Sequence, residues 1–251
     1  MKKTNLKRAL PLFGLVLACM LHLPFSFGKS AVWNEDAAYR NAMNATAMHA
    51  SLATTATMVY QHLNLDELGL SEQAYTYAIQ GLAKLKETGT ITNDRIISIV
   101  DFTKSSAQKR LFVIDLEKEQ LLFNTFVAHG QNSGLEYATR FSNNPESYQS
   151  SLGFYETSGT YNGKNGYSMQ LIGLESGIND KADKRAIVMH GAPYVNESMA
   201  KTQGRIGRSW GCPAVAEKMN KPIIDKIKNG SCLFIYANNT KYLHTSRILN
   251  S

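Results

Sequence analysis

Seven short apolar segments between residues 96 and 236 limit what this chain can fold into more than any other feature. They span residues 96–102, 110–116, 121–128, 153–157, 167–174, 186–190 and 232–236. Each has the length of a strand, and turn-forming runs such as Asn143-Asn144-Pro145 and residues 162–166 separate most of them. Short strands at such intervals predict a mainly β domain, folded as an antiparallel sandwich or barrel.

Helical periodicity is confined to two places. The first stretch begins at Ser71, a good N-cap, and ends near Gly89, a good helix stop. The second spans residues 220–228, with Pro222 in its first turn, and should pack three isoleucines on a sheet. With the Ala-, Thr- and Met-rich residues 35–64, the pattern predicts an N-terminal helical segment at residues 29–92. The main domain should then occupy residues 93–240, and residues 241–251 should form a C-terminal tail.

The N-terminus has the composition of a targeting segment. Lys2, Lys3, Lys7 and Arg8 precede an apolar stretch, residues 9–27, that is short and interrupted by proline. This order predicts a secretory signal peptide at residues 1–28, and therefore a secreted or periplasmic protein of the cell envelope without a stable membrane span. Cys19 lies in a sequence that resembles a bacterial lipobox, so lipidation there is the alternative.

The net charge of +7 does not indicate a nucleic-acid-binding protein. Four of the 27 basic residues belong to the extreme N-terminus, which leaves 23 basic against 20 acidic residues after residue 28. No basic run is interleaved with aromatic residues, as nucleic-acid binding would require. The sequence carries no signal for an oligomeric state.

Histidine and cysteine occur close together in the C-terminal part, each beside a glycine. His190 ends an apolar segment and precedes Gly191, and Cys212 ends the segment 209–212, Ser-Trp-Gly-Cys. A thiol attacks as its thiolate and needs a base, while a neighbouring glycine lets backbone N–H groups approach an oxyanion. We therefore expect Cys212 as nucleophile, His190 as base and Gly211 at the oxyanion position. The simpler alternative is that both residues only pack.

A second histidine and a second cysteine compete for these roles. His129 also follows an apolar segment and precedes glycine, so it is the rival base. If Cys19 leaves with a signal peptide, Cys212 and Cys232 remain, and an oxidising compartment permits a disulfide. Cys232 lies in a short apolar run, however, so we expect it in the core and Cys212 free. No Cys/His spacing resembles a zinc site, and no metal or cofactor is expected.

These motifs resemble the murein L,D-transpeptidases that carry a YkuD-type catalytic domain. Their motif is a His-Gly at a strand end followed by Ser/Thr-x-Gly-Cys. Residues 207–214, Gly-Arg-Ser-Trp-Gly-Cys-Pro-Ala, are similar to a divergent branch in which Trp replaces the more usual His. The similarity extends over residues 68–237 and includes 99–102, 127–130, 141–143 and 150–155.

The resemblance implies an L,D-transpeptidase-like catalytic domain at residues 93–240 and a secreted cysteine acyltransferase of peptidoglycan. Cys212 would form a thioester with a stem peptide at diaminopimelate and release the terminal D-alanine. Transfer to an amine would give a 3→3 cross-link, and transfer to water would make the protein an L,D-carboxypeptidase. The family motif runs from the His-Gly into the segment that ends in Cys212, residues 204–212, here called the Cys loop. His190 is therefore preferred to His129 as the base.

Substrate contacts are expected around the Cys loop. Family members usually carry Arg or Asn two residues after the Cys, where this chain has Ala214, so Arg208 or Arg205 should supply the charge. Trp210 should form an apolar wall beside the thiol, because its indole cannot act as a base. The expected substrate-binding residues are Arg208, Ser209, Trp210, His129 and Tyr194.

Two other functions are compatible with parts of this pattern. A non-catalytic cell-wall-binding protein would keep the fold and lose the chemistry. Another secreted Cys peptidase or transpeptidase would also pair Cys with His. Papain-like enzymes, however, place the Cys before the His, and the sortase Thr-Leu-x-Thr-Cys segment is missing from this sequence.

Overall fold

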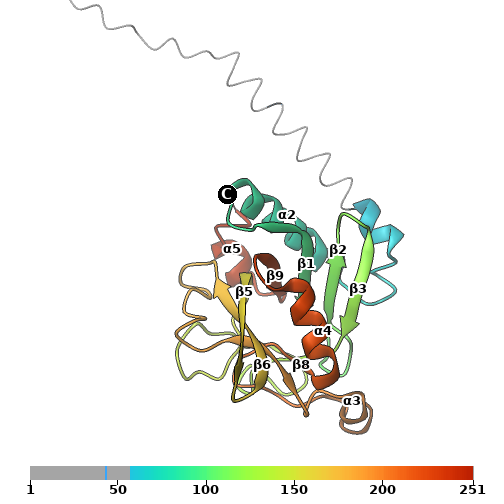
Figure 1. Ribbon diagram of the computed structural model, residues 1–251, viewed down its shortest axis with the longest axis vertical. Helices are drawn as coiled ribbons and strands as arrows, with labels where there is room; N and C mark the ends of the chain where they lie inside the picture. Colours follow the sequence, from blue (N-terminus) through green and yellow to red (C-terminus); the bar gives the residue numbers. More distant parts are fainter. Residues whose placement is uncertain (1–42, 44–56, 251) are drawn as a thin grey trace, which may run out of the picture. The chain divides into compact units, whose positions relative to one another are not determined.

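Nine strands form one sheet in the computed structural model, which describes residue 43 and residues 57–250. The sheet order is β3-β2-β1-β9-β5-β6-β7-β8-β4. Its two edge strands, β3 and β4, are separated in the chain by Phe126 alone, so the sheet curls into a nearly closed barrel (Figure 1). The strands are β1 (Asn93–Asp101), β2 (Leu111–Asp115), β3 (Gln120–Thr125), β4 (Val127–Ala128), β5 (Gly153–Gly163), β6 (Gly166–Gly173), β7 (Val188–Ala192), β8 (Ala214–Ala216) and β9 (Ser231–Tyr236).

The mainly β class expected from the sequence is confirmed, but the sheet is mixed rather than antiparallel throughout. The β1–β9 and β7–β8 pairs are parallel, and the other pairs are antiparallel. Parallel neighbours need a long connection between them, and both of these pairs have one. Apolar periodicity reports burial and not strand direction, so it does not reveal such pairs. The parallel β7–β8 pair is the one that builds the candidate site.

The core fills the inside of this curved sheet. Every residue of β2 and β9 is buried, as expected for strands that are covered on both faces. Phe154 of β5 stacks on Phe234 of β9, with ring centroids 4.2 Å apart, where these two strands pair. Cys232 is fully buried beside them, which confirms its expected place in the core.

Helix α2 (Glu72–Glu87) covers one end of the sheet, against β1 and β9. The Ser71 hydroxyl accepts a hydrogen bond from the Ala74 N–H, and Gly89 has a φ of +68° just after the helix, as the sequence predicts. At Gly81 the helix approaches so closely that an added Cβ would overlap the Phe154 ring. A glycine inside this helix therefore lets it reach the core.

Helix α4 (Glu217–Ile227) lies against β6, β7 and β8 (Figure 1). Ile223, Ile224 and Ile227 are buried, as expected from their spacing. The helix starts three residues before the predicted position, so Pro222 lies inside it and not in its first turn. Strand β8 and two short helices, α3 (Glu197–Gln203) and α5 (Thr240–Thr245), were not expected. Elements of this length are too short for apolar periodicity to indicate them.

The C-terminal residues belong to the folded core. Tyr242 of α5 is buried, and its hydroxyl donates to Glu175, as does the hydroxyl of Ser246. The Phe154 N–H also donates to Glu175, at 2.8 Å. A buried carboxylate is stable only with such donors, so the segment expected as a tail holds a charged group of the core in place.

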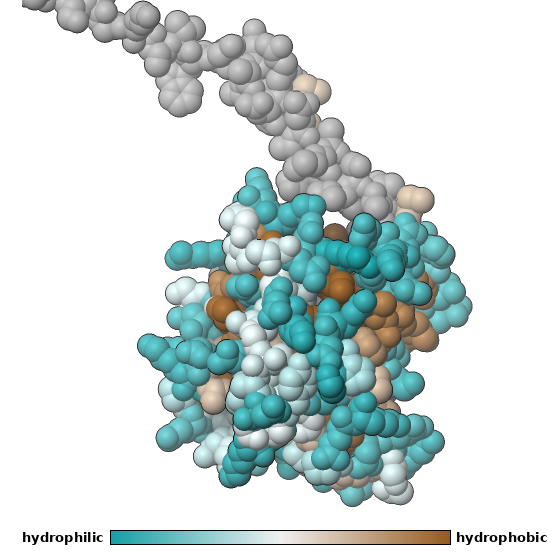
Figure 2. Space-filling model, in the orientation of Figure 1, coloured by the Kyte–Doolittle hydropathy of each residue, from teal (hydrophilic) through white to brown (hydrophobic). Residues whose placement is uncertain are grey.

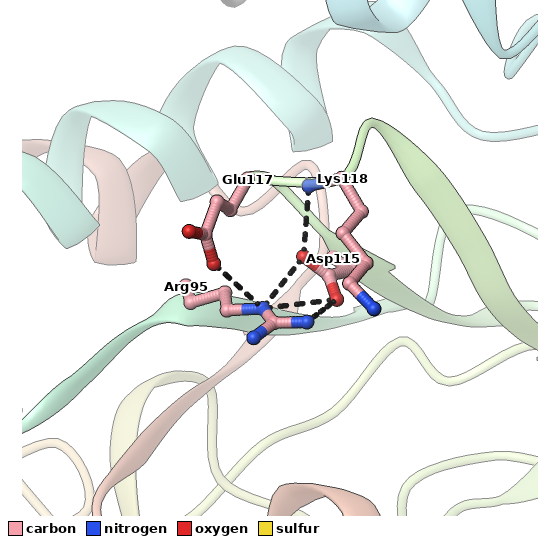
Figure 3. A network of polar contacts seen from close by, with 4 residues as sticks. All are labelled: Arg95, Asp115, Glu117 and Lys118. Carbon is pink, nitrogen blue, oxygen red and sulfur yellow. Dashed lines mark hydrogen bonds and ion pairs between the residues drawn. The ribbon is translucent and has the colours of Figure 1, made fainter.

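A cluster of charges closes the β1–β2 pair. Arg95 of β1 donates two hydrogen bonds from Nε and one from Nη2 to the Asp115 carboxylate of β2, and Glu117 lies 3.0 Å from the same Nε (Figure 3). The Lys118 N–H donates to Asp115 as well. Charge-assisted bonds of this kind fix the register of the two strands.

Figure 2 shows that the face turned to the viewer is mostly hydrophilic, with small apolar areas between polar side chains. No helix in the described part of the chain is long and apolar enough to cross a membrane. The proposed signal peptide and Cys19 lie outside the described residues.

By its contacts the chain divides into Met1–Thr46 and Ala47–Ser251. Helix α2 and all of α5 after Thr240 lie outside the predicted domain bounds of 93–240, but their buried residues belong to the same hydrophobic core as the strands. The boundaries at residues 92 and 240 therefore stay a proposal.

Candidate active site

Parallel pairing of β7 with β8 brings the histidine and the cysteine together. His190 pairs with Ala214 in this ladder, and the same register continued two residues back sets Cys212 opposite Val188. The Val188 N–H indeed points to the Cys212 sulfur, at 3.5 Å. Side chains two residues apart in a strand share a face, so positions 188 and 190 face the same side of β7. The site is therefore built on the sheet and not on a loose loop.

The Cys212 sulfur is enclosed by the backbone that leads into β7. Its thiol donates to the Ala186 carbonyl, at 3.6 Å, and only 9% of the residue is exposed. Burial raises the pKa of the Cys212 thiol, while the Val188 N–H and the Arg185 charge act in the opposite direction. The resting cysteine is thus a neutral thiol. Cys212 and Cys232 are both free and buried, so no disulfide joins them.

His190 has one ring nitrogen free to act as a base. Its Nδ1 lies 2.9 Å from the Gly191 carbonyl, and a carbonyl can only accept, so Nδ1 carries the proton and Nε2 carries a lone pair. Burial lowers the pKa of His190, which keeps the imidazole neutral. Gly191 suits this position because helix α4 approaches it closely: an added Cβ would lie 3.1 Å from the Cβ of Asn220.

His129 is placed differently. It is fully buried, its Nδ1 accepts from Arg110, and its Nε2 lies 3.2 Å from the Gly134 carbonyl, to which it donates. Burial, together with the Arg110 charge, lowers the pKa of His129 to about 3. With both ring nitrogens engaged, His129 holds its own loop in place and presents no group to a substrate.

The Cys loop is held by its own serine and glycine. Ser209 is buried, and its hydroxyl donates to the Cys212 carbonyl at 2.6 Å and accepts from the Gly211 N–H at 3.0 Å. Gly211 has a φ of +123°, and an added Cβ would lie 2.7 Å from the Gln149 carbonyl oxygen. The N–H of Gly211 is therefore occupied by the Ser209 hydroxyl. The loop requires a glycine at this position because of the positive φ and the nearby Gln149 carbonyl.

Trp210 points to solvent from this loop. It is 68% exposed, and its ring lies 5.6 Å from that of Tyr148, which is also exposed. Tyr148 itself has a left-handed backbone, with a φ of +53°. The two rings form an exposed aromatic pair, and the apolar wall beside the thiol stays a prediction.

The two arginines expected near the thiol bind backbone carbonyls. Arg208 donates from Nη1 to the carbonyls of Gln131 and Gly134, so it ties the Cys loop to the His129 loop. Arg205 contacts the carbonyl of its neighbour Ile206. The guanidinium whose charge lowers the pKa of the Cys212 thiol belongs to Arg185. Sequence reasoning missed Arg185 because no motif marks it; the one available signal is its position just before the strand that carries His190.

A hollow of about 400 Å³ opens on the His190 side of the site. Its lining comes from β7, from the β5–β6 turn and from the start of α4, and includes His190, Tyr194, Lys164 and Glu217. Burial raises the pKa of Tyr194 to about 12, and the nearby Cys212 adds to the effect. Of the residues expected to bind substrate, Tyr194 is the one that lines this hollow.

Comparisons with known proteins identify the family. A family model described as the L,D-transpeptidase catalytic domain matches residues 66–236, more than half of the chain. The protein therefore belongs to the L,D-transpeptidase catalytic domain family. A search of curated proteins found no significant match.

Several solved structures show weak similarity. An L,D-transpeptidase from Mycobacterium smegmatis is 12% identical, with a TM-score of 0.35 over 57% of this chain and 59% of that one. The helical cell shape determining protein Pgp2 from Campylobacter jejuni is 14% identical, with a TM-score of 0.40 over 64% and 57%. An L,D-transpeptidase from Stackebrandtia nassauensis is 15% identical, with a TM-score of 0.35 over 68% and 69%. The chain thus spans less than two thirds of the first two structures.

Proposed function

We propose that this protein is a peptidoglycan L,D-transpeptidase of the cell envelope, with Cys212 as nucleophile and His190 as base. The observation that carries the proposal is the state of the His190 ring: Nδ1 donates to the Gly191 carbonyl, which leaves the lone pair on Nε2. His129 has no such nitrogen. The family membership supplies the reaction class.

The proposed reaction begins from a neutral pair. No hydrogen bond joins the Cys212 sulfur to the His190 ring among the described residues, and the two side chains lie two strand positions apart. The thiol proton moves to His190 Nε2 as the sulfur attacks the carbonyl carbon of the stem peptide. The C–N bond then breaks, and His190 returns the proton to the leaving D-alanine amine.

The thioester is resolved by the reverse proton transfer. An acceptor amine or a water molecule loses a proton to His190 and attacks the thioester carbonyl, which releases the cysteine sulfur to be protonated again. An amine gives a 3→3 cross-link, and water gives a trimmed stem. The oxyanion formed in each step is assigned to the Cys212 N–H, because the Ser209 hydroxyl occupies the N–H of Gly211.

The test is a product assay with matched cysteine variants. The full chain is incubated with a disaccharide-tetrapeptide, and the products and the intact protein are weighed by mass spectrometry. We expect a covalent adduct on Cys212 together with dimer or trimmed stem. Cys212→Ala should abolish both, whereas Cys232→Ala should keep both because Cys232 lies in the core. Turnover by Cys212→Ala would refute the proposal, and wall binding without any adduct would favour a non-catalytic binding protein.

A further inference from the structure

Arg185 lies where the chain turns toward the candidate nucleophile. Its neighbour Ala186 has a φ of +51°, a left-handed conformation that costs a non-glycine residue about 1 kcal/mol or more. Through this turn the Ala186 carbonyl receives the Cys212 thiol, and the Val188 N–H follows two residues later. The segment 185–188 therefore wraps around the sulfur, with Arg185 at its start.

The Arg185 guanidinium is fixed by neutral partners alone. Nη1 donates to the Ser142 carbonyl at 2.8 Å and to the Ser151 hydroxyl at 2.5 Å. Nη2 donates to the Gln149 carbonyl at 2.6 Å and to the Ser147 hydroxyl at 3.3 Å. Within the described residues no carboxylate forms an ion pair with it. A half-buried cation is thus held in place with its charge left uncompensated.

This charge faces the Cys loop directly. A Cβ added to Gly211 would lie 3.2 Å from Arg185 Nη2, so the guanidinium rests against the residue that precedes Cys212. The same Gln149 carbonyl that accepts from Arg185 would lie 2.7 Å from that Cβ. No side chain can therefore come between the guanidinium and the loop.

The other ionisable groups around the thiol are neutral. Tyr194 faces Cys212 from the segment after β7, and Tyr155 faces Arg185 from β5; burial raises the pKa of both phenols. Burial lowers the pKa of His190, so its imidazole is uncharged as well. The groups that act to raise the pKa of Arg185 are Tyr155 and Cys212. Arg185 is the charged side chain whose positive charge lowers the pKa of the Cys212 thiol.

We propose that Arg185 is the positioning residue that stabilises the thiolate form of Cys212 and holds residues 142–151 against the Cys loop. The inference rests on the proposed function, because it concerns the same nucleophile. A fixed cation beside the Cys loop offsets part of the cost of ionising a thiol that is almost fully buried. The charge comes from a different segment than the Cys loop, where sequence reasoning placed it.

The experiment measures the ionisation of Cys212 without turnover. The rate at which iodoacetamide alkylates Cys212 is followed from pH 6 to 11 by intact mass and peptide mapping. In Arg185→Gln the midpoint of the profile should move up by about one pH unit or more, the size of effect that an opposite charge at short range produces. Arg185→Lys should recover most of the wild-type profile, because it keeps the charge and loses only the planar fork.

Two further arginines serve as controls. Arg140→Gln removes an equal charge from a guanidinium that binds a loop carbonyl, that of Asn132, and should leave the midpoint unchanged. Arg208→Gln tests the position favoured by the sequence. The inference is overturned if Arg185→Gln keeps the wild-type midpoint, if Arg185→Lys moves as far as Arg185→Gln, or if Arg208→Gln alone produces the shift.

Two further measurements distinguish an effect of the Arg185 charge from misfolding and from a failure of the proposed function. Near-ultraviolet circular dichroism checks that each variant is folded. If Arg185→Gln does not fold, the wild type itself tests the charge: alkylation of Cys212 by anionic iodoacetate relative to iodoacetamide should be faster than for free cysteine, and an equal or lower ratio overturns the inference. A failed turnover assay with an intact Arg185 effect contradicts the proposed function, whereas normal turnover with an unchanged profile contradicts only this inference.

Discussion

The two histidines of the site are distinguished by where their ring protons are held. The Nδ1–H of His190 donates a hydrogen bond to the Gly191 carbonyl, so the lone pair of Nε2 is available to accept a proton. His129 is enclosed between Arg110 and the Gly134 carbonyl, and both its nitrogens are engaged. At the residue scale the difference between a base and a structural residue is therefore one hydrogen-bond partner.

Matched glutamine variants of the two histidines test this assignment. His190→Gln should reduce turnover by about 10²- to 10⁴-fold, the usual contribution of general acid–base catalysis, with little change in stability. His129→Gln should keep most of the turnover, because His129 does not line the hollow and both its ring nitrogens are bound within the protein. Initial rates on disaccharide-tetrapeptide, compared at equal folded fraction, give the answer. A larger loss in His129→Gln would move the base to the other loop.

Elements meet in this fold at glycines that have no room for a side chain. Helix α2 touches β5 where Gly81 lies on the Phe154 ring, and α4 touches β7 where Gly191 lies against Asn220. The first contact secures the helix to the core, and the second sets the strand that carries His190. Close approach of helix and sheet at these two points decides how rigidly the site is held.

Gly81→Ala tests the contact between α2 and the sheet. Alanine favours a helix by about 1 kcal/mol over glycine. The new Cβ would nevertheless overlap the Phe154 ring, so we expect a net loss of about 1 to 3 kcal/mol in the free energy of unfolding. Thr76→Ala, on the exposed side of the same helix, should not destabilise. Urea unfolding measures both, and a Gly81→Ala protein as stable as Thr76→Ala would show that the helix can shift at no cost.

At the scale of the whole molecule, protonation of the buried His129 destabilises the folded protein. The pKa of His129 is about 3 in the folded protein and about 6.5 in an unfolded chain. Between these values the unfolded chain binds more protons, so stability rises with pH there and falls on acidification. The contribution of His129 is complete above pH 6.5 and is lost as the pH drops toward 3.

This linkage predicts an acid-sensitive protein. Lowering the pH from 6 to 4 should reduce the free energy of unfolding by about 1.4 kcal/mol per pH unit through His129. Glu175 acts in the opposite direction, because burial raises its pKa. Urea unfolding of wild type and His129→Gln at several pH values isolates the histidine term, since only the wild type should show the added slope. Parallel slopes for the two proteins would exclude it.

The sequence by itself determined the parts of this protein that depend on local pattern. Seven apolar segments predict the mainly β class, Ser71 and Gly89 bracket helix α2, and the His-Gly and Ser-Trp-Gly-Cys motifs resemble those of the family whose model matches the chain. Each of these signals is written in neighbouring residues, because burial and capping repeat with the period of a strand or helix.

Only the tertiary structure decided which groups surround the thiol. The parallel β7–β8 pair sets Cys212 beside Val188, Arg185 reaches the Cys loop across residues 142–151, and a single carbonyl decides the His190 tautomer. These contacts join segments far apart in the chain, and the residue types alone allow Arg208 as readily as Arg185. Charge and hydrogen bonding act over a few ångströms in space, so their partners are fixed by the way the sheet closes and not by distance along the sequence.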